Sequence, residues 1–283
     1  MSNLSQFKLS LIIATYGRDK EVDDLLLSLT LQDCSKDDFE VIIVDQNDKI
    51  DLSLIINKYN LVLNLNHIKS NVKGLSISKN KGIKAAKAPI ITFPDDDCTF
   101  YSNTISSALS YLEHHSNVDI VYGRLYDRKS QENIMRVWSS EDKVLNKLNF
   151  HTNYSAVTCF SKRKELLFDE MYGVGAKYGS GEELDYIMQA LNNEMTVHYS
   201  PTIDIWHPPL NVLVMSKEKV YLYGYGYGKI FRKNFNWIFF SIFISAIAYQ
   251  LLDLLKGCLM FDKNLVVKRA TSLKARIHGF LNL

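Results

Sequence analysis

The sequence has few cysteines and none in a paired motif. Its 283 residues contain only Cys34, Cys98, Cys159 and Cys258, which stand far apart. Without a Cys-x-x-Cys pair, neither a zinc knuckle nor a disulfide framework is indicated, and a reducing cytoplasm is the simplest setting. The first eight residues also lack the apolar run of a secretory signal, so we expect synthesis in the cytoplasm without export.

Net charge is small as well, at +2, but it is unevenly distributed. Residues 217–283 contain 11 Lys/Arg and 3 Asp/Glu, a balance of +8, whereas residues 1–216 contain 22 Lys/Arg and 28 Asp/Glu, a balance of −6. A hydrophobic content of 47% excludes disordered and repeat classes. We therefore expect a folded α/β domain over residues 1–216 and a basic helical extension over residues 217–283.

Short apolar runs alternate with helical patterns in the first part of the chain, which is typical of a mostly parallel sheet with crossover helices. Strands are predicted at 9–14, 41–44, 61–68 and 89–93, and helices at 20–31, 51–59 and 76–87, the last with Lys79 on its solvent face. Further along, we expect helices at 103–115 and 181–192, strands near 118–122, 135–138 and 156–160, and loops across 124–154.

Three polar clusters follow predicted strands: Thr15-Tyr16-Gly17-Arg18, Asp45-Gln46-Asn47-Asp48 and Asp95-Asp96-Asp97. Ligands of open α/β sheets bind beyond the carboxyl ends of the strands, so one crevice could gather all three clusters. Adjacent carboxylates repel one another unless a cation is bound, and oxygen-rich clusters suit Mg²⁺ or Mn²⁺. The alternative for the triplet is a solvated acidic turn.

Two further motifs carry acid or imidazole groups. Gly179-Ser180-Gly181 precedes a predicted helix with Glu182, Glu183 and Asp185 in its first turn. Such acids are either helix caps or, since crowding raises proton affinity, a source of a general base. His207 precedes two prolines and is either a packed structural residue or a ligand for a borderline metal such as Mn²⁺.

The basic extension contains an apolar stretch. Residues 237–255 carry one charge, Asp253, and basic residues flank them on both sides. Cations on both sides favour attachment to an anionic membrane surface over a buried helix or dimer contact, and place a true membrane span third. Before this stretch, four tyrosines alternate with glycines that allow close backbone approach. The tyrosines, with Lys229, Arg232 and Lys233, would suit a lipid-diphosphate head group: Tyr221, Tyr223, Tyr225 and Tyr227.

Five segments in order carry a resemblance: ATYGR, VIIVDQND, KGLSISKNKGI, ITFPDDDCTFY and FDEMYGVGAKYGSGEELDYI. Together they resemble the family 2 glycosyltransferases of the GT-A fold, over residues 8 to about 210. The tyrosine-rich segment and the apolar stretch are similar to bacterial members that build O-antigen or capsular polysaccharide.

The resemblance implies roles for individual positions. The residues implied at the nucleotide and diphosphate are Thr15, Tyr16, Arg18, Asp45, Gln46, Lys73, Lys79 and Asn80. Asp95 or Asp96 would contact the ribose, and the implied ligands of Mn²⁺ or Mg²⁺ are Asp97, Asp95 and His207. Glu183 is the implied catalytic base, with Glu182 as a contender and Asp185 in a supporting role.

The function implied is inverting transfer of a sugar from a nucleotide-diphosphate sugar, with UDP favoured. The acceptor would be a lipid-linked or other saccharide, met by a peripheral protein at the inner face of the cell membrane, with a homo-oligomer left open. A nucleotidyltransferase and a non-catalytic sugar-nucleotide-binding subunit are the alternatives, and neither the sugar nor the linkage is determined. The basic residues lie in an apolar context rather than in a reading helix, which excludes a nucleic-acid-binding class.

Overall fold

The computed structural model describes residues 7–209 and 214–282. The chain forms two compact units. The first comprises residues 1–73, 77–167 and 190–209, and the second comprises residues 74–76, 168–189 and 210–283. The second unit thus takes in most of α5 (Glu182–Asn192) together with the C-terminal helices. The predicted division of the chain at residue 216 stays a prediction.

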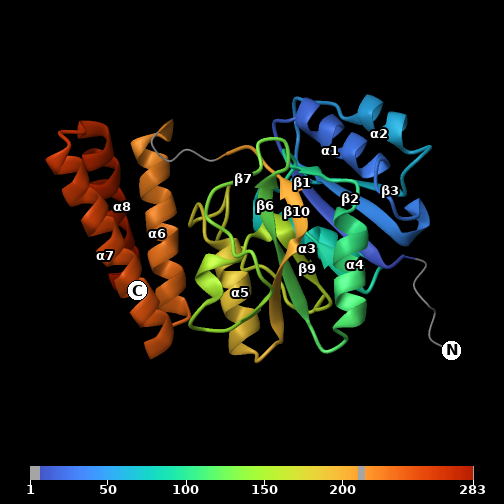
Figure 1. Ribbon diagram of the computed structural model, residues 1–283. Helices are drawn as coiled ribbons and strands as arrows, with labels where there is room; N and C mark the ends of the chain where they lie inside the picture. The colour runs from blue at the N-terminus through green and yellow to red at the C-terminus, as the bar shows by residue number, and fades with distance from the viewer. Residues whose placement is uncertain (1–6, 210–213, 283) are drawn as a thin grey trace. The chain divides into compact units, whose positions relative to one another are not determined.

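One mixed, mainly parallel sheet of ten strands forms the first unit (Figure 1). Its main order is β3 (Leu65–Lys69), β2 (Phe39–Asp45), β1 (Leu9–Thr15), β4 (Ile90–Thr92), β9 (Cys159–Ser161), β6 (Ile120–Asp127), β10 (Val197–Trp206) and β5 (Thr99–Phe100). Two short strands, β7 (Glu132–Asn133) and β8 (Lys143–Leu145), pair with β6 and β10. All seven residues of β1 and of β2 are buried, as expected for apolar runs in the middle of a sheet.

Four helices accompany these strands: α1 (Lys20–Thr30), α2 (Ser53–Tyr59), α3 (Leu75–Ala85) and α4 (Thr104–His114). In α1 the predicted apolar stripe, which includes Val22, Leu25 and Leu29, is completely buried. The backbone N–H of Lys20 donates to the Asp19 carboxylate, which caps the start of this helix. The fold class predicted from the sequence is thereby confirmed, and so are the helices predicted before residue 116.

The solvent-facing position predicted for Lys79 was wrong. Lys79 is 1% exposed and lies on the buried stripe of α3 with Gly82 and Ile83. A side-chain carbon at Gly82 would overlap with Ile12 of β1, so this face of the helix lies directly on the sheet. Lys79 lies on this face of α3, three residues before the glycine.

Other segments differ from the prediction as well. The strand predicted at 61–68 begins only at Leu65, and the strand predicted near 156–160 is a 3-10 helix over Ala156–Thr158 that leads into β9. Residues 135–138 form no strand, because Met135 has a φ of 66° and the Trp138 indole N–H donates to the carbonyl of Ile134 at 2.9 Å, as in a turn. Strand β10 was missed. Its apolar alternation is broken at Pro201, and its pairing with β6 shifts register between Tyr199 and Asp204.

Three long helices form the C-terminal part of the second unit: α6 (Lys217–Lys233), α7 (Trp237–Leu259) and α8 (Lys263–Leu281). Helix α8 packs against both α6 and α7. The apolar stretch predicted at 237–255 lies within α7, the one helix in the described residues long and apolar enough to cross a membrane. Only 17% of its apolar window is buried among the described residues.

Candidate active site

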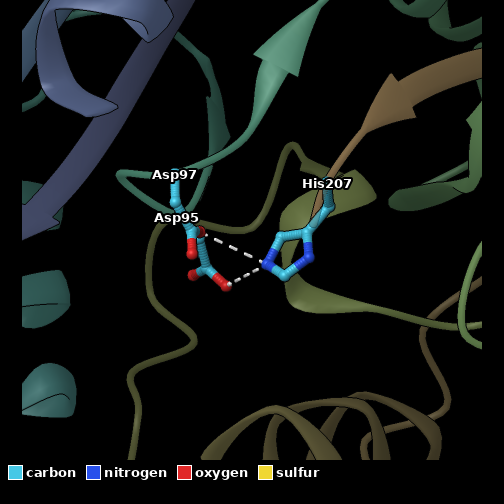
Figure 2. Close-up of side chains that lie close together, drawn as sticks. All are labelled: Asp95, Asp97 and His207. Carbon is cyan, nitrogen blue, oxygen red and sulfur yellow. Dashed lines mark ion pairs between the residues drawn. The ribbon is translucent and has the colours of Figure 1, made fainter. Parts of the chain in front are cut away.

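The acidic triplet lies between β4 and β5 and faces His207 (Figure 2). Strand β5 begins at Thr99, which pairs with Trp206, the last residue of β10. This pairing brings His207, the next residue, alongside the triplet. The His207 Nε2 atom lies 3.3 Å from Asp97 Oδ1 and 3.6 Å from Asp95 Oδ2.

The hydrogen bond on the other side of the ring orients His207. Its Nδ1 lies 2.6 Å from the carbonyl oxygen of Pro208, which can only accept, so Nδ1 carries the proton. In the neutral ring this leaves the Nε2 lone pair aimed at the carboxylates, the arrangement found in metal-binding histidines. Burial lowers the pKa of His207, but hydrogen bonds to Asp95 and Asp97 outweigh it and raise the pKa to about 10. A divalent ion and this proton therefore compete for the same nitrogen.

These three side chains fit a divalent cation. One ligand atom from each of Asp95, Asp97 and His207 lies within 4.8 Å of the others. Two carboxylate oxygens suit Mg²⁺ and Mn²⁺ alike, and the imidazole favours Mn²⁺. The sequence placed His207 here only through the family resemblance, and the pairing of β5 with β10 supplies the physical reason.

Arg18 also pairs with the triplet. Its guanidinium contacts Asp96 through NH1 and Asp97 Oδ2 through NH2, the latter at 2.8 Å. Burial raises the pKa of Asp96 despite the nearby arginine, whereas for Asp97 the effect of burial is outweighed by His207 and Arg18, which lower its pKa. Arg18 is thus an internal counter-ion of the triplet.

The three predicted polar clusters do meet at one edge of the sheet. Thr15 pairs with Asp45 at the ends of β1 and β2, and Ala14 bridges to Asp95. The Gln46 backbone N–H donates to the Thr15 carbonyl at 3.0 Å. Strand ends 30 and 80 residues apart in the sequence are therefore neighbours, as the parallel order predicted.

The carboxylate of Asp45 is completely buried and already hydrogen-bonded. Oδ1 accepts from the Asn47 backbone and side chain at 2.8 and 2.9 Å, and Oδ2 accepts from His67 at 2.9 Å and Lys69 at 2.8 Å. Burial raises the pKa of Asp45, but these bonds prevail and hold it below its usual value. His67 and Lys69 were not predicted from the sequence. Their spacing of two residues places them on the same face of β3, where they pair with Ile43 and Asp45 of β2. That spacing was the signal in the sequence that could have identified them.

Tyr16 directly follows β1 at this edge of the sheet and is 52% exposed. Lys73 Nζ lies 2.9 Å from the Tyr16 hydroxyl, 2.9 Å from Asp48 Oδ2 and 4.4 Å from the centre of the Tyr16 ring. Two of the residues implied at the nucleotide are therefore together and accessible. Lys79 and Asn80, at 1% and 3% exposed, are instead buried in α3.

The acid cluster of the second unit opens α5. Glu182 and Glu183 are half-buried in its first turn. Asp185, two residues after Glu183, is completely buried. Asp185 Oδ2 accepts from Lys233 at 2.9 Å and Gln189 at 2.6 Å, and Oδ1 accepts from Asn234 at 2.9 Å. An enclosed carboxylate with these partners is suited to support rather than to proton transfer.

The fold is that of the GT-A glycosyltransferases, with an acid and histidine cluster at the carboxyl ends of its strands. The family described as Glycosyl transferase family 2 matches residues 10–172, more than half of the chain, and the chain belongs to this family.

Known proteins are similar to this chain in sequence or in structure. The Staphylococcus aureus poly(ribitol-phosphate) beta-N-acetylglucosaminyltransferase TarS is 33% identical over 117 residues, which cover 40% of this chain and 20% of TarS. A crystal structure of TarS 1–349 with UDP-GlcNAc has a TM-score of 0.57 at 19% identity, covering 98% of this chain and 93% of that one. The mannosyltransferase PcManGT from Pyrobaculum calidifontis, in complex with GDP-Man and Mn²⁺, has a TM-score of 0.66 at 13% identity, covering 97% and 87%.

Proposed function

We propose that this protein is a metal-dependent, inverting glycosyltransferase that uses a nucleotide-diphosphate sugar, with a UDP-sugar favoured. The observation that carries the proposal is the convergence of Asp95, Asp97 and His207 at the strand ends. Membership of family 2 and the UDP-GlcNAc and GDP-Man complexes of similar structures support a nucleotide-sugar donor.

Asp97, Asp95 and His207 would hold Mn²⁺ or Mg²⁺. Such an ion stabilises the negative charge that develops on the departing diphosphate. Arg18 pairs with Asp96 and with the ligand Asp97, and so neutralises part of the negative charge of the triplet. His207 keeps its Nε2 aimed at the cluster because Pro208 holds the opposite nitrogen.

The nucleoside would lie across the ends of β1 and β2. Tyr16 offers an accessible ring and Lys73 an adjacent cation. Thr15 and Gln46 border the same edge. The carboxylate of Asp45 already accepts from Asn47, so it would orient Asn47 rather than accept a hydrogen bond from the nucleoside. Lys79 and Asn80 are buried in α3, and they would lie below the bound nucleotide.

Glu183 would accept the proton of the acceptor hydroxyl, with Glu182 as the alternative. Attack on the face opposite to the leaving diphosphate inverts the anomeric centre. We expect Glu183→Gln to reduce transfer at least about a hundredfold, and Glu182→Gln to reduce it less than tenfold. The opposite ranking of the two variants, measured by product formation, would assign the base to Glu182.

The acceptor would be a lipid-diphosphate-linked saccharide in bacterial surface polysaccharide synthesis, met at the inner face of the cell membrane. Helix α7 supports a membrane surface as partner, because large apolar side chains are exposed along it: Trp237, Ile244, Leu251, Leu252, Leu255 and Leu259. Lys256 and Lys263 are exposed beside this face and complement anionic lipid.

Fewer residues of α6 are free for a head group than the sequence suggested. Lys233 binds Asp169 and Asp185, and Lys229 is 8% exposed with its Nζ 2.7 Å from the carbonyl of Asn282. Tyr227 packs against Phe231 and Phe243. Tyr221 and Tyr225 contact His278 and remain half-exposed. These two tyrosines and the exposed Arg232 are the members that we propose for contact with the acceptor.

A nucleotide-release assay tests the function. The purified protein is incubated with Mn²⁺ or Mg²⁺ and UDP-, GDP- or dTDP-sugars, beside an Asp97→Ala variant. Release of one nucleoside diphosphate by the wild-type protein and its loss in the variant would support the proposal. Release of pyrophosphate would instead indicate a nucleotidyltransferase, and metal-dependent nucleotide binding without turnover would indicate a non-catalytic subunit.

A further inference from the structure

The three glycines of α6 do not share one role, although they alternate evenly with tyrosines. Gly224 and Gly228 face α8. A side-chain carbon at Gly224 would lie 2.9 Å from Ala275 Cβ, and one at Gly228 would overlap with the carbonyl of Arg276. Gly279 of α8 likewise leaves room only for the backbone of α6. The two helices therefore pack backbone against backbone through these small residues.

Gly226 faces the turn that opens α5. A side-chain carbon there would lie 2.6 Å from the carbonyl oxygen of Ser180 and 2.8 Å from its hydroxyl. The Ser180 hydroxyl donates to the carbonyl of Tyr223 in α6 at 3.2 Å. Gly181 has a φ of 99°, and a side chain on it would meet Ile230 of α6 at 2.9 Å. The turn of residues 179–181 therefore packs directly against α6. The contacts require glycine both in the turn, at Gly181, and in the helix, at Gly226.

This turn determines where α5 starts. The backbone N–H of Asp185 donates to the carbonyl of Gly181 at 2.9 Å, closing the first turn that carries Glu182 and Glu183. At the other end of α6, Lys233 binds Asp185 at 2.9 Å and Asp169 at 2.7 Å. Helix α6 therefore contacts the start of α5 at two positions seven residues apart. Gly226 packs against the backbone of Ser180, and Lys233 forms an ion pair with Asp185.

We propose that α6 is a positioning element of the active site, and that Gly226 and Lys233 are the residues through which it fixes the carboxylates of Glu182 and Glu183. The inference rests on the proposed function, in which one of these carboxylates is the base. It makes the basic C-terminal segment a part of the catalytic unit, and not only a means of membrane attachment.

The structure gives the size of the perturbation. Because the contact at Gly226 is with backbone, an added methyl group cannot be accommodated by a rotamer change, and the turn must shift by several tenths of an ångström or more. A displacement of a catalytic group by about 1 Å costs about a hundredfold in rate. We therefore expect Gly226→Ala to lower the turnover number by about thirtyfold or more, with the KM for the donor changed less than about threefold.

The matched control is Gly224→Ala. It adds the same methyl group to the same helix two residues away, but against Ala275 and Ser272 of α8 rather than the turn. We expect it to lower the melting temperature about as much as Gly226→Ala does, while the turnover number stays within about threefold of wild type. Equal loss of turnover in the two variants would overturn the inference.

A readout without turnover separates the inference from the proposed function. Hydrogen exchange of a peptide covering residues 179–186 is expected to accelerate in Gly226→Ala and in Lys233→Met but not in Gly224→Ala. Lys233→Met adds no bulk, and it provides the exchange measurement if Gly226→Ala does not fold. Unchanged exchange in both test variants would refute the positioning role, even in an active enzyme. An inactive wild type with the expected exchange pattern would refute the function and leave the positioning of the turn intact.

Discussion

Removal of the Arg18 guanidinium is expected to strengthen metal binding in the absence of nucleotide. Arg18 NH2 lies 2.8 Å from Asp97 Oδ2, and an ion held by Asp97 would be about 2.2 Å from a carboxylate oxygen. The guanidinium and the ion would then be about 5 Å apart. Charges of +1 and +2 at that separation repel by about 1.7 kcal/mol in a solvent-like dielectric, which corresponds to roughly ten- to twentyfold in affinity.

The solvent-like value is appropriate because the Arg18 side chain is 37% exposed. The assay is titration of the apoprotein with Mn²⁺, followed by calorimetry or by the electron paramagnetic resonance signal of free Mn²⁺, without nucleotide. Arg18→Ala is compared with Lys20→Ala, which removes the same charge from an exposed position at the start of α1. Unchanged or weaker Mn²⁺ binding in Arg18→Ala would refute the reasoning and show that Arg18 orients the ligands instead of competing with the ion.

Three other outcomes follow from the same structure. Replacing His207 by Asn is expected to weaken Mn²⁺ binding by about tenfold or more and Mg²⁺ binding by less, because imidazole is a ligand that favours Mn²⁺; equal losses for the two metals would argue against His207 as a ligand. Leu252→Gln with Leu255→Gln is expected to reduce co-sedimentation with anionic vesicles severalfold, whereas Leu61→Gln, at a still more exposed leucine of the first unit, is expected to leave it unchanged; persistence of binding in the double variant would exclude α7 as the lipid contact. Asp45→Asn is expected to lower stability by about 2 kcal/mol at neutral pH. Since the folded state lowers the pKa of Asp45, this stabilisation is present above the unfolded value and is lost as the pH falls through the folded one, so the difference in melting temperature from wild type is expected to vanish in acid.

The sequence alone predicted the first four parallel strands of the sheet and the meeting of the polar groups at their ends. Continuous apolar runs such as residues 9–14 and 41–44 are typical of parallel strands, which are buried on both faces. Because the carboxyl ends of parallel strands lie at one edge of the sheet, the polar groups that follow these runs meet there. Thr15, Asp45 and Asp95 are neighbours for that reason. The resemblance of five ordered segments added the family, which the match over residues 10–172 confirms.

Side-chain partners needed the tertiary structure, because they depend on register and packing that periodicity does not encode. His207 reaches Asp97 only because β10, broken by Pro201, still pairs with β5. Lys79 is buried on the face of α3 where Gly82 contacts Ile12 of β1, and not on the solvent face that the pattern predicted.

The glycines of α6 show the same limit. In the sequence, Gly224, Gly226 and Gly228 form one even repeat that predicts close backbone approach without naming what approaches. Only the packing of α8 on one side of α6 and of Ser180 on the other assigns each glycine its partner. Local pattern therefore determined where the backbone could come close, and long-range packing decided which residues it met.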